Sequence, residues 1–375
     1  MAAPKSNKAR TDWYQVLTNQ TVEGLEECLA NPVDTWQKMW AGMNGLPRNG
    51  LTGRFYNGLN VWFLAWALQR LLKRLAEEGR QVVHDPRWYT FDQAMQAVGY
   101  KRNPKWKGRK DTFKGIKKWL WNGEGPEPKG LGVRKGEKGV KVFYWRFIKK
   151  YENRATGKAV RKPTPEQIAS GEVKLVGTIP FLKIHTVFNA NQIEGLESID
   201  IPDVDPGEKY IQAQCLVDLM PGLNVRHIAG SDMAGYNKHS DEVLMPAPGQ
   251  FDSIEHYWAT VLHEMTHWTG HENRLDRDLS NRFGSDAYAF EELVAELGSV
   301  FLCAHLGIEG NLQHPQYLAS WIRRMKEDKY AVFKAASLAQ KAVDFILAGG
   351  AVESEDDKTS DVDPDDADTT QARAA

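Results

Sequence analysis

The first half of the chain shows two kinds of hydrophobic pattern. The segments 140–147 and 181–189 are rich in β-branched and aromatic residues, which predicts two strands. The polar and basic stretch between them, 150–177, contains two prolines and predicts a loop or linker. Apolar residues three and four positions apart predict helices in three other segments: 12–29, 61–78 and 91–98.

The second half is dominated by helical spacing. A short strand at 224–228 and a hairpin of 236–239 with 242–245 come first, and Pro246 ends the hairpin. Helices are predicted at 210–220, 254–269, 288–304, 317–326 and 330–347. The fold class is therefore α+β, with helices and a small sheet in the N-terminal part and a mainly helical C-terminal part.

The predicted helix at 254–269 contains the motif His-Glu-x-x-His. His263 and His267 are four positions apart, so they lie on one face of a helix, one turn from each other, and can share a metal ion. Glu264 projects about 100° round the helix from His263, so it can lie beside the ion as a general base without binding it. Gly270 follows, where a helix is expected to end.

A third ligand is needed, because catalytic zinc sites use three protein ligands and an open position. Glu292 and Glu296 lie four positions apart on the next helix, and Glu292 is the candidate ligand. Glu296 can accept a hydrogen bond from a ligand histidine and fix its tautomer. His271 is the alternative ligand, but it lies beyond Gly270. A metzincin pattern fails, because Asn273 occupies the position of its last histidine. The arrangement is that of a gluzincin, with Zn²⁺ as the expected ion and Mn²⁺ or Co²⁺ as alternatives.

The net charge of −1 hides a strongly basic segment. Residues 101–162 contain 21 Lys and Arg against 5 Asp and Glu, a net charge of +16, which leaves −17 for the rest of the chain. Nine aromatic residues lie in the same segment, and residues 103–128, where cationic and aromatic side chains alternate, are interpreted as a basic insertion. Cations neutralise phosphates and exposed rings stack on unpaired bases, so this composition predicts binding of a polyanion such as single-stranded nucleic acid. The candidate contacts are Lys105, Lys107, Arg134, Lys135, Lys138 and Lys141. Solvated lysines around core aromatics are the alternative explanation.

The remaining composition excludes several protein classes. The three cysteines are isolated, so neither a disulfide framework nor a cysteine zinc site is indicated. No signal peptide or membrane-spanning stretch is present, which predicts a cytoplasmic protein with no membrane partner. A polar tail at 1–11 and an acidic, disordered tail at 349–375 are expected, because residues 353–368 carry nine acids and one Lys.

Several motifs along the chain resemble those of the ArdC antirestriction family. In the N-terminal half these are Pro47 to Asn49, Tyr56 to Asn60, Asp85 to Phe91, Arg134 to Gly139 and Thr186 to Asn189. In the C-terminal half they are His263 to His271, Arg274-Leu275, Phe283 to Ser285 and Glu291 to Leu297. The N-terminal part is also similar to that of TraC-type conjugative primases.

The resemblance implies a single-stranded-DNA-binding domain at 12–196 and a zincin-like metallopeptidase domain at 197–348. Family members are carried by plasmids, phages and other mobile elements and protect incoming DNA from host restriction. The family pattern places the metal on His263 and His267, with Glu264 catalytic, and extends to Glu292 as third ligand. Arg48 and Tyr56, in the N-terminal motifs, join the DNA-binding candidates. In zincins a strand beside the cleft binds the substrate backbone, and 242–245 is the candidate.

Two functions from different classes follow. In the first, the protein is a zinc metallopeptidase whose DNA-binding domain brings it to a protein substrate, either host restriction machinery or proteins bound to the incoming strand. In the second, the protein coats single-stranded DNA and the metal site is structural. A nuclease or primase is a third possibility, but the basic segment lacks the clustered acids of a two-metal site.

Overall fold

The computed structural model describes residues 11–30, 46–108, 115–197, 199, 206–279, 285–310 and 315–351. Almost all of the predicted tails at 1–11 and 349–375 therefore lies outside the described residues. Contacts between residues divide the chain into two compact units. Among the described residues, unit 1 contains the chain up to Trp88, Asn189–Asn191 and the residues from Glu197 to Ala351, and unit 2 contains Tyr89–Phe188 and Gln192–Leu196. The predicted domain boundary at 196/197 remains a prediction.

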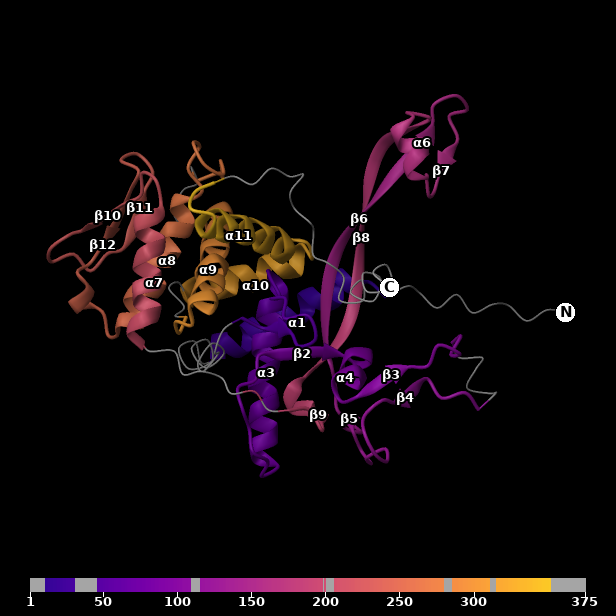
Figure 1. Ribbon diagram of the computed structural model, residues 1–375. Coiled ribbons are helices and arrows are strands. Elements are labelled where there is room, and N and C mark those ends of the chain that lie inside the picture. Colours follow the sequence, from indigo (N-terminus) through magenta and orange to yellow (C-terminus); the bar gives the residue numbers. More distant parts are fainter. Residues whose placement is uncertain are drawn as a thin grey trace. The chain divides into compact units, whose positions relative to one another are not determined.

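Helices form most of unit 1 (Figure 1). Helix α9 lies at its centre and packs against both α8 and α11. Gly298 of α9 permits a close approach to α8, because a Cβ there would lie 2.5 Å from Thr266 Cγ2. Ser299 Oγ then donates a hydrogen bond across the contact to Ala259 O at 2.8 Å. The helices of this part are α7 (Pro206–Leu219), α8 (Ile254–Trp268), α9 (Asp286–Leu306), α10 (Leu318–Glu327) and α11 (Ala331–Leu347).

The N-terminal helices α1 (Trp13–Ala30) and α3 (Leu59–Glu77) belong to the same unit. Helix α1 packs against α10, and Thr18 Oγ1 donates a hydrogen bond to Lys329 O at 2.7 Å. At the start of α3, Gly58 N donates to Gln340 Oε1 of α11 at 2.8 Å. Unit 1 is therefore closed by segments from both ends of the chain.

Two sets of short strands complete unit 1. Strand β1 (Arg48–Asn49) pairs in parallel with the start of β2 (Arg87–Thr90). A three-stranded sheet has the order β10-β12-β11, from β10 (Asn224–His227), β11 (Gly235–Asn237) and β12 (Glu242–Met245). The hairpin turn between β11 and β12 contains Asp241 at φ 53°. These elements match the strand and hairpin predicted at 224–245.

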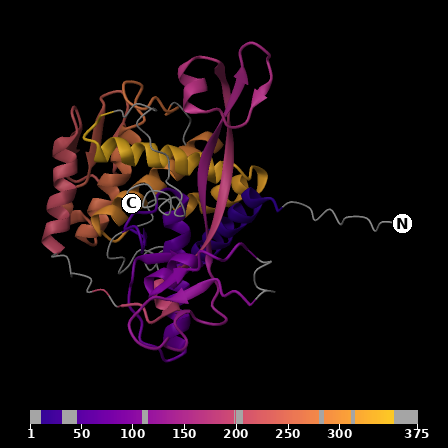
Figure 2. The ribbon, with the colours of Figure 1, turned by 45° about the vertical axis from the view of Figure 1, so that its right-hand side comes forward.

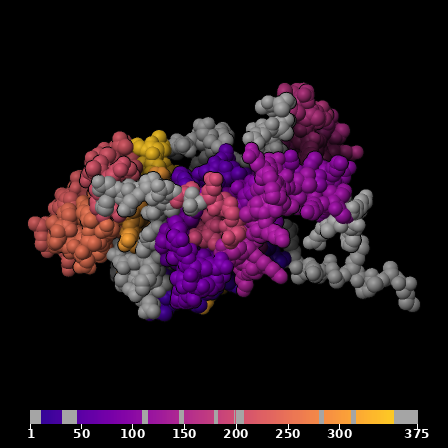
Figure 3. Space-filling view, turned by 60° about the horizontal axis from the view of Figure 1, so that its bottom comes forward, coloured from indigo at the N-terminus to yellow at the C-terminus, as the bar shows by residue number. Residues whose placement is uncertain are grey.

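Unit 2 is built around a long antiparallel hairpin of β6 (Val140–Asn153) and β8 (Val173–Asn189) (Figure 2). The prediction of a loop at 150–177 is wrong at both ends of the segment. Strand β6 continues to Asn153 and β8 begins at Val173, and the polar composition reflects side chains that are mostly exposed or half-buried rather than an absence of strands. The hairpin end carries β7 (Ala159–Val160) and α6 (Pro165–Ala169), visible as a magenta lobe in the space-filling view (Figure 3).

The remaining elements of unit 2 are short. Helix α4 (Phe91–Ala97) lies in the predicted segment 91–98, and the Thr90 side chain caps it by accepting a hydrogen bond from Gln93 N. Strand β3 (Tyr100–Arg102) pairs with β4 (Trp119–Trp121), and β5 (Gly132–Val133) pairs with β9 (Ile193–Glu194). The two units together confirm the predicted α+β class. In the part of the chain that is described, no helix has the length and apolar character needed to cross a membrane.

Candidate metal centre

Helix α8 positions the two motif histidines in the interior of unit 1. The Ser253 side chain caps the helix by accepting a hydrogen bond from His256 N at 3.0 Å. Most residues of the helix from Tyr257 onward are buried, and His263 is fully buried. The rings of His263 and His267 have centroids 4.9 Å apart, as expected for positions one turn apart on one face.

Helix α9 brings Glu292 to these rings. Glu292 Oε2 lies 3.4 Å from His263 Nε2 and 3.6 Å from His267 Nε2. One ligand atom from each residue lies within 4.8 Å of the others. A tetrahedral ion with bonds of about 2.0–2.2 Å holds neighbouring ligand atoms about 3.3–3.6 Å apart. The three side chains therefore fit a single ion, and His271 is not in this group.

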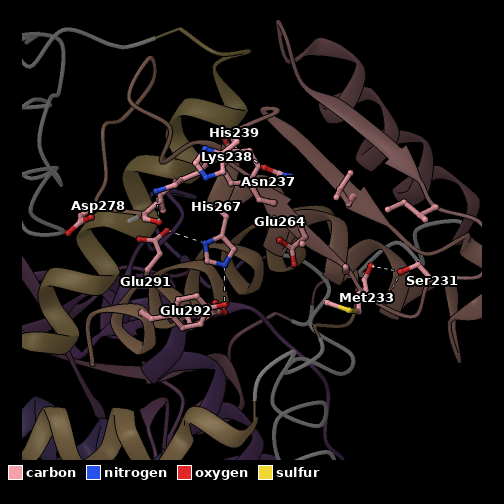
Figure 4. Close-up of a pocket in the computed structure, with 17 residues that line it drawn as sticks. Ser231, Met233, Asn237, Lys238, His239, Glu264, His267, Asp278, Glu291 and Glu292 are labelled. Atoms are coloured by element: carbon pink, nitrogen blue, oxygen red, sulfur yellow. Dashed lines mark hydrogen bonds and ion pairs between the residues drawn. The ribbon is translucent and has the colours of Figure 1, made fainter. Parts of the chain in front are cut away.

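Glu291 orients the His267 ring. Its Oε1 lies 3.2 Å from His267 Nδ1 (Figure 4). The guanidinium of Arg277 lies 2.9 Å from the same carboxylate oxygen. The Arg277 side chain is only 4% exposed and also donates hydrogen bonds to Thr269 Oγ1 and to Thr266 O. Such a carboxylate fixes which ring nitrogen is left for a metal.

The helical spacing predicts this orienting role for Glu296. That residue is fully buried one turn further along α9, and its role remains a prediction. The orienting role of Glu291 could not be predicted from the sequence. It depends on the contact with Arg277, and the spacing of residues does not show that the Arg277 side chain lies against α9. Two adjacent acids next to a ligand position were the available signal.

The pKa values of the cluster reflect its buried carboxylates. Burial lowers the pKa of His263, and its hydrogen bond to Glu292 only partly offsets this. Burial also acts against protonation of His267, but the hydrogen bonds to Glu291 and Glu292 raise its pKa to about 10. Burial alone would raise the pKa of Glu292, yet the two histidines hold it well below its usual range. The same negative field that favours a proton on His267 favours a cation between the three side chains.

A cavity of about 610 Å³ opens beside the cluster and is lined by Glu264, His267, Tyr288, Glu291 and Glu292. Figure 4 shows the His267 ring between the carboxylates of Glu291 and Glu292, with Glu264 facing the cavity beside it. Glu264 is 5% exposed. Tyr288 is a further residue of the site that the sequence did not predict. Burial and a hydrogen bond to Glu292 raise the pKa of its phenol.

Strand β11 forms another wall of this cavity, which Gly235, Tyr236 and Asn237 all line. It pairs with β12 on one side, and no described strand pairs with its other side. The predicted substrate strand, 242–245, is β12, which lies between β10 and β11. That prediction is therefore corrected. Both edges of β12 are already hydrogen bonded, so β11 is the strand that can pair with an extended peptide.

Two family models match the chain. Residues 216–338 match a zincin-like metallopeptidase, and residues 11–188 match the N-terminal domain of anti-restriction factor ArdC. The crystal structure of metal-free antirestriction protein ArdC from plasmid R388 is similar, with 31% sequence identity and a TM-score of 0.59. The match covers 91% of this chain and 98% of that one. The chain belongs to the ArdC family.

A second R388 ArdC structure, described as Mn(II)-bound, is 30% identical with a TM-score of 0.58 and is covered over its whole length. The uncharacterized protein y4eC of Sinorhizobium fredii is 35% identical over 350 residues, 93% of this chain and 95% of that protein. Two DNA primases TraC of Escherichia coli are 36% and 32% identical and cover 88% and 90% of this chain. The chain spans only 27% and 20% of the length of these primases.

The DNA-binding candidates fall within the part matched by the ArdC N-terminal model, and most are in unit 2. Lys135 and Lys138 are in the turn between β5 and β6, and both are exposed. Lys105 and Lys107 are exposed between β3 and β4.

Three other candidates have partners or are buried. Arg134 forms an ion pair with Glu137 at 3.0 Å, and Lys141 Nζ donates a hydrogen bond to Thr186 Oγ1. Tyr56, in unit 1 with Arg48, is 3% exposed, so its ring cannot stack on a base in this conformation.

Proposed function

We propose that this ArdC-family chain is an antirestriction protein of a mobile element, a plasmid or phage, that binds single-stranded DNA and cleaves peptide bonds with a metal ion. The observation that carries the peptidase part is the convergence of His263, His267 and Glu292 at 3.4–3.6 Å, beside Glu264 and an open cavity. The protein substrate would belong to the host restriction machinery or be bound to the incoming DNA.

His263 Nε2, His267 Nε2 and a carboxylate oxygen of Glu292 would hold the ion. Two imidazoles and one carboxylate suit Zn²⁺, and they also accept Mn²⁺, the ion named for the R388 ArdC structure. A bound divalent ion would act as a Lewis acid that polarises the peptide carbonyl. Glu291 would keep the Nδ1 proton on His267 and thereby present Nε2 to the ion.

The chain's own residues would do the rest of the chemistry. Glu264 would accept the proton of the attacking water on a carboxylate oxygen and pass it to the leaving amine. A substrate peptide would pair with the open edge of β11 as an added strand, which places its backbone along the cavity. The cavity walls would exclude bulk water from the reacting carbonyl.

Replacement of Glu292 by Gln should weaken metal binding more than about 100-fold, because even a residue that only orients a ligand typically contributes about 10–100-fold. An amide is a poor substitute for a carboxylate between two imidazoles. Titration calorimetry with Zn²⁺ and with Mn²⁺ would measure the affinity. Glu272→Gln, a change at an exposed position, is the matched control. Binding by the Glu292→Gln variant at full affinity would refute the proposed ligand set.

The DNA-binding part of the proposal is supported by the basic residues of unit 2 and by the family match. Charge reversal at Lys135 and Lys138 together should weaken binding of an oligothymidylate and flatten its salt dependence. The slope of log K against log salt changes by about 0.7 for each phosphate of a single strand that the protein no longer neutralises, so a change of about 1.4 is expected.

The matched control reverses two exposed lysines on helices of unit 1, Lys73 and Lys341, for the same change in net charge. An equal loss of affinity in the control would show that net charge alone governs binding. It would remove the assignment of these two lysines.

A further inference from the structure

The loop that joins β1 to α3 in unit 1 presents apolar side chains to solvent. Phe55 is 60% exposed and Leu51 is 44% exposed. The next residue, Tyr56, is 3% exposed. Successive side chains of an extended segment point to opposite sides, so the inward position of Tyr56 turns Phe55 outward. A phenylalanine exposed to this extent contributes little to the core of unit 1.

The loop is held in one conformation by its own hydrogen bonds. Asn49 Oδ1, on a residue that is 4% exposed, accepts from Leu51 N and Thr52 N at 3.0 Å each. Asn49 N donates to Arg54 O at 2.8 Å, and Gly53 adopts φ 73°, which favours glycine. Arg48 forms a β-bridge with Phe55. A ring displayed on a preorganised loop loses little conformational entropy when it binds a ligand.

The loop that carries Phe55 is positively charged. Residues 46–58 contain Arg48 and Arg54 and no acidic residue. Among the described residues, neither arginine forms an ion pair. An exposed ring on a loop with two arginines, which form no ion pair with the described residues, complements a ligand that has flat apolar faces and negative charges spaced along a chain.

We propose that Phe55 is a stacking platform for an unpaired base of single-stranded DNA, with Arg48 and Arg54 contacting the neighbouring phosphates. The inference rests on the proposed DNA binding and assigns part of it to unit 1. It replaces Tyr56 by Phe55 as the ring that contacts a base. The charge of the loop favours this polyanion over a second copy of the chain, which would place the same arginines opposite each other.

The test compares Phe55→Ala and Phe55→Trp with the unchanged full-length protein. The probes are a fluorescent oligothymidylate and an abasic strand of the same length and charge. Phe55→Ala should weaken oligothymidylate binding about 5-fold to 150-fold, which corresponds to stacking of about 1–3 kcal/mol. It should leave abasic binding unchanged, and Phe55→Trp should retain affinity. Arg54→Ala should weaken binding of both strands.

The control is Ile211→Ala, which removes a side chain that is 65% exposed on α7 of the same unit. Its affinity for both strands should equal that of the unchanged protein. The thermal transition should not move in either alanine variant, since both side chains are exposed.

Unchanged oligothymidylate binding by Phe55→Ala, or an equal loss on the abasic strand, overturns the stacking role while the proposed DNA binding stands. A smaller sedimentation coefficient for Phe55→Ala, with DNA binding unaffected, assigns the surface to self-association and also overturns the inference. Failure of the unchanged protein to bind either strand removes the proposed DNA binding itself, and the stacking role with it.

Discussion

A Glu264→Gln variant should lose peptidase activity by about 10²–10⁴-fold while it keeps its bound metal. The amide has the size of the carboxylate but cannot accept the proton of the attacking water. Glu264 is not among the three side chains that converge on the candidate ion position, so metal affinity should be unchanged. The measurements are cleavage of an unfolded protein substrate and the metal content of the purified variant.

The same variant separates the two functions considered for this chain. If protection of transferred DNA requires proteolysis, Glu264→Gln should lose protection in a recipient cell that carries a restriction system, and Glu272→Gln should keep it. If Glu264→Gln protects as well as the unchanged protein while the double charge reversal at Lys135 and Lys138 does not, the protein acts by occupying DNA. Full cleavage by Glu264→Gln would contradict the proposed mechanism.

Arg277→Ala should destabilise unit 1 by about 3–5 kcal/mol, the usual cost of removing one partner of a buried ion pair. The change leaves Glu291 buried without its guanidinium and removes the hydrogen bonds to Thr266 and Thr269. Urea unfolding would measure the loss of stability. Because Glu291 orients His267, metal affinity should also fall by about 10–100-fold.

The control for this prediction is Arg323→Ala. Its ion pair with Asp286 joins side chains that are 60% and 68% exposed, and such pairs contribute only about 0–1 kcal/mol. Similar losses in the two variants would contradict the importance assigned to the Arg277 pair.

The Arg277 pair also predicts a dependence of stability on pH. Burial raises the pKa of Glu291, but His267 and Arg277 together hold it below its usual value. A carboxylate whose pKa is lower in the folded state stabilises the fold above its unfolded pKa of about 4.3, and this stabilisation is lost as the pH falls through the folded value. The unchanged protein should therefore lose more stability on acidification than Arg277→Ala, which has already lost the share of this contribution that comes from Arg277.

The sequence predicted the parts of the site that depend on local spacing. Two histidines four positions apart must share a helix face, and an acid on the following helix was the natural third ligand. Residues that act through tertiary contacts were not accessible. The contact of Arg277 with Glu291 and that of Tyr288 with Glu292 depend on how a loop folds back and how α9 is rotated.

Strand order and the full length of the long strands were not accessible for a similar reason. Hydrophobic patterns locate β11 and β12 but carry no strand order, so the substrate strand was misassigned. In the 150–177 segment Leu175 and Val176 are exposed, so the strand ends there do not show the alternation of a half-buried strand. Phe55 and Tyr56 are adjacent aromatic residues, and the sequence does not show which of them is buried. The structure shows that Tyr56 is buried and Phe55 is exposed.

The closure of unit 1 by both ends of the chain has a consequence for its biogenesis. Thr18 and Lys329, joined by a hydrogen bond, are 311 positions apart, and Gly58 bonds to Gln340. Helices α1 and α3 therefore leave the ribosome long before α10 and α11 exist to cover them. Contacts of such long range form late and slowly. We expect nascent chains to expose these N-terminal helices until α10 and α11 have emerged, so chaperones would meet them first.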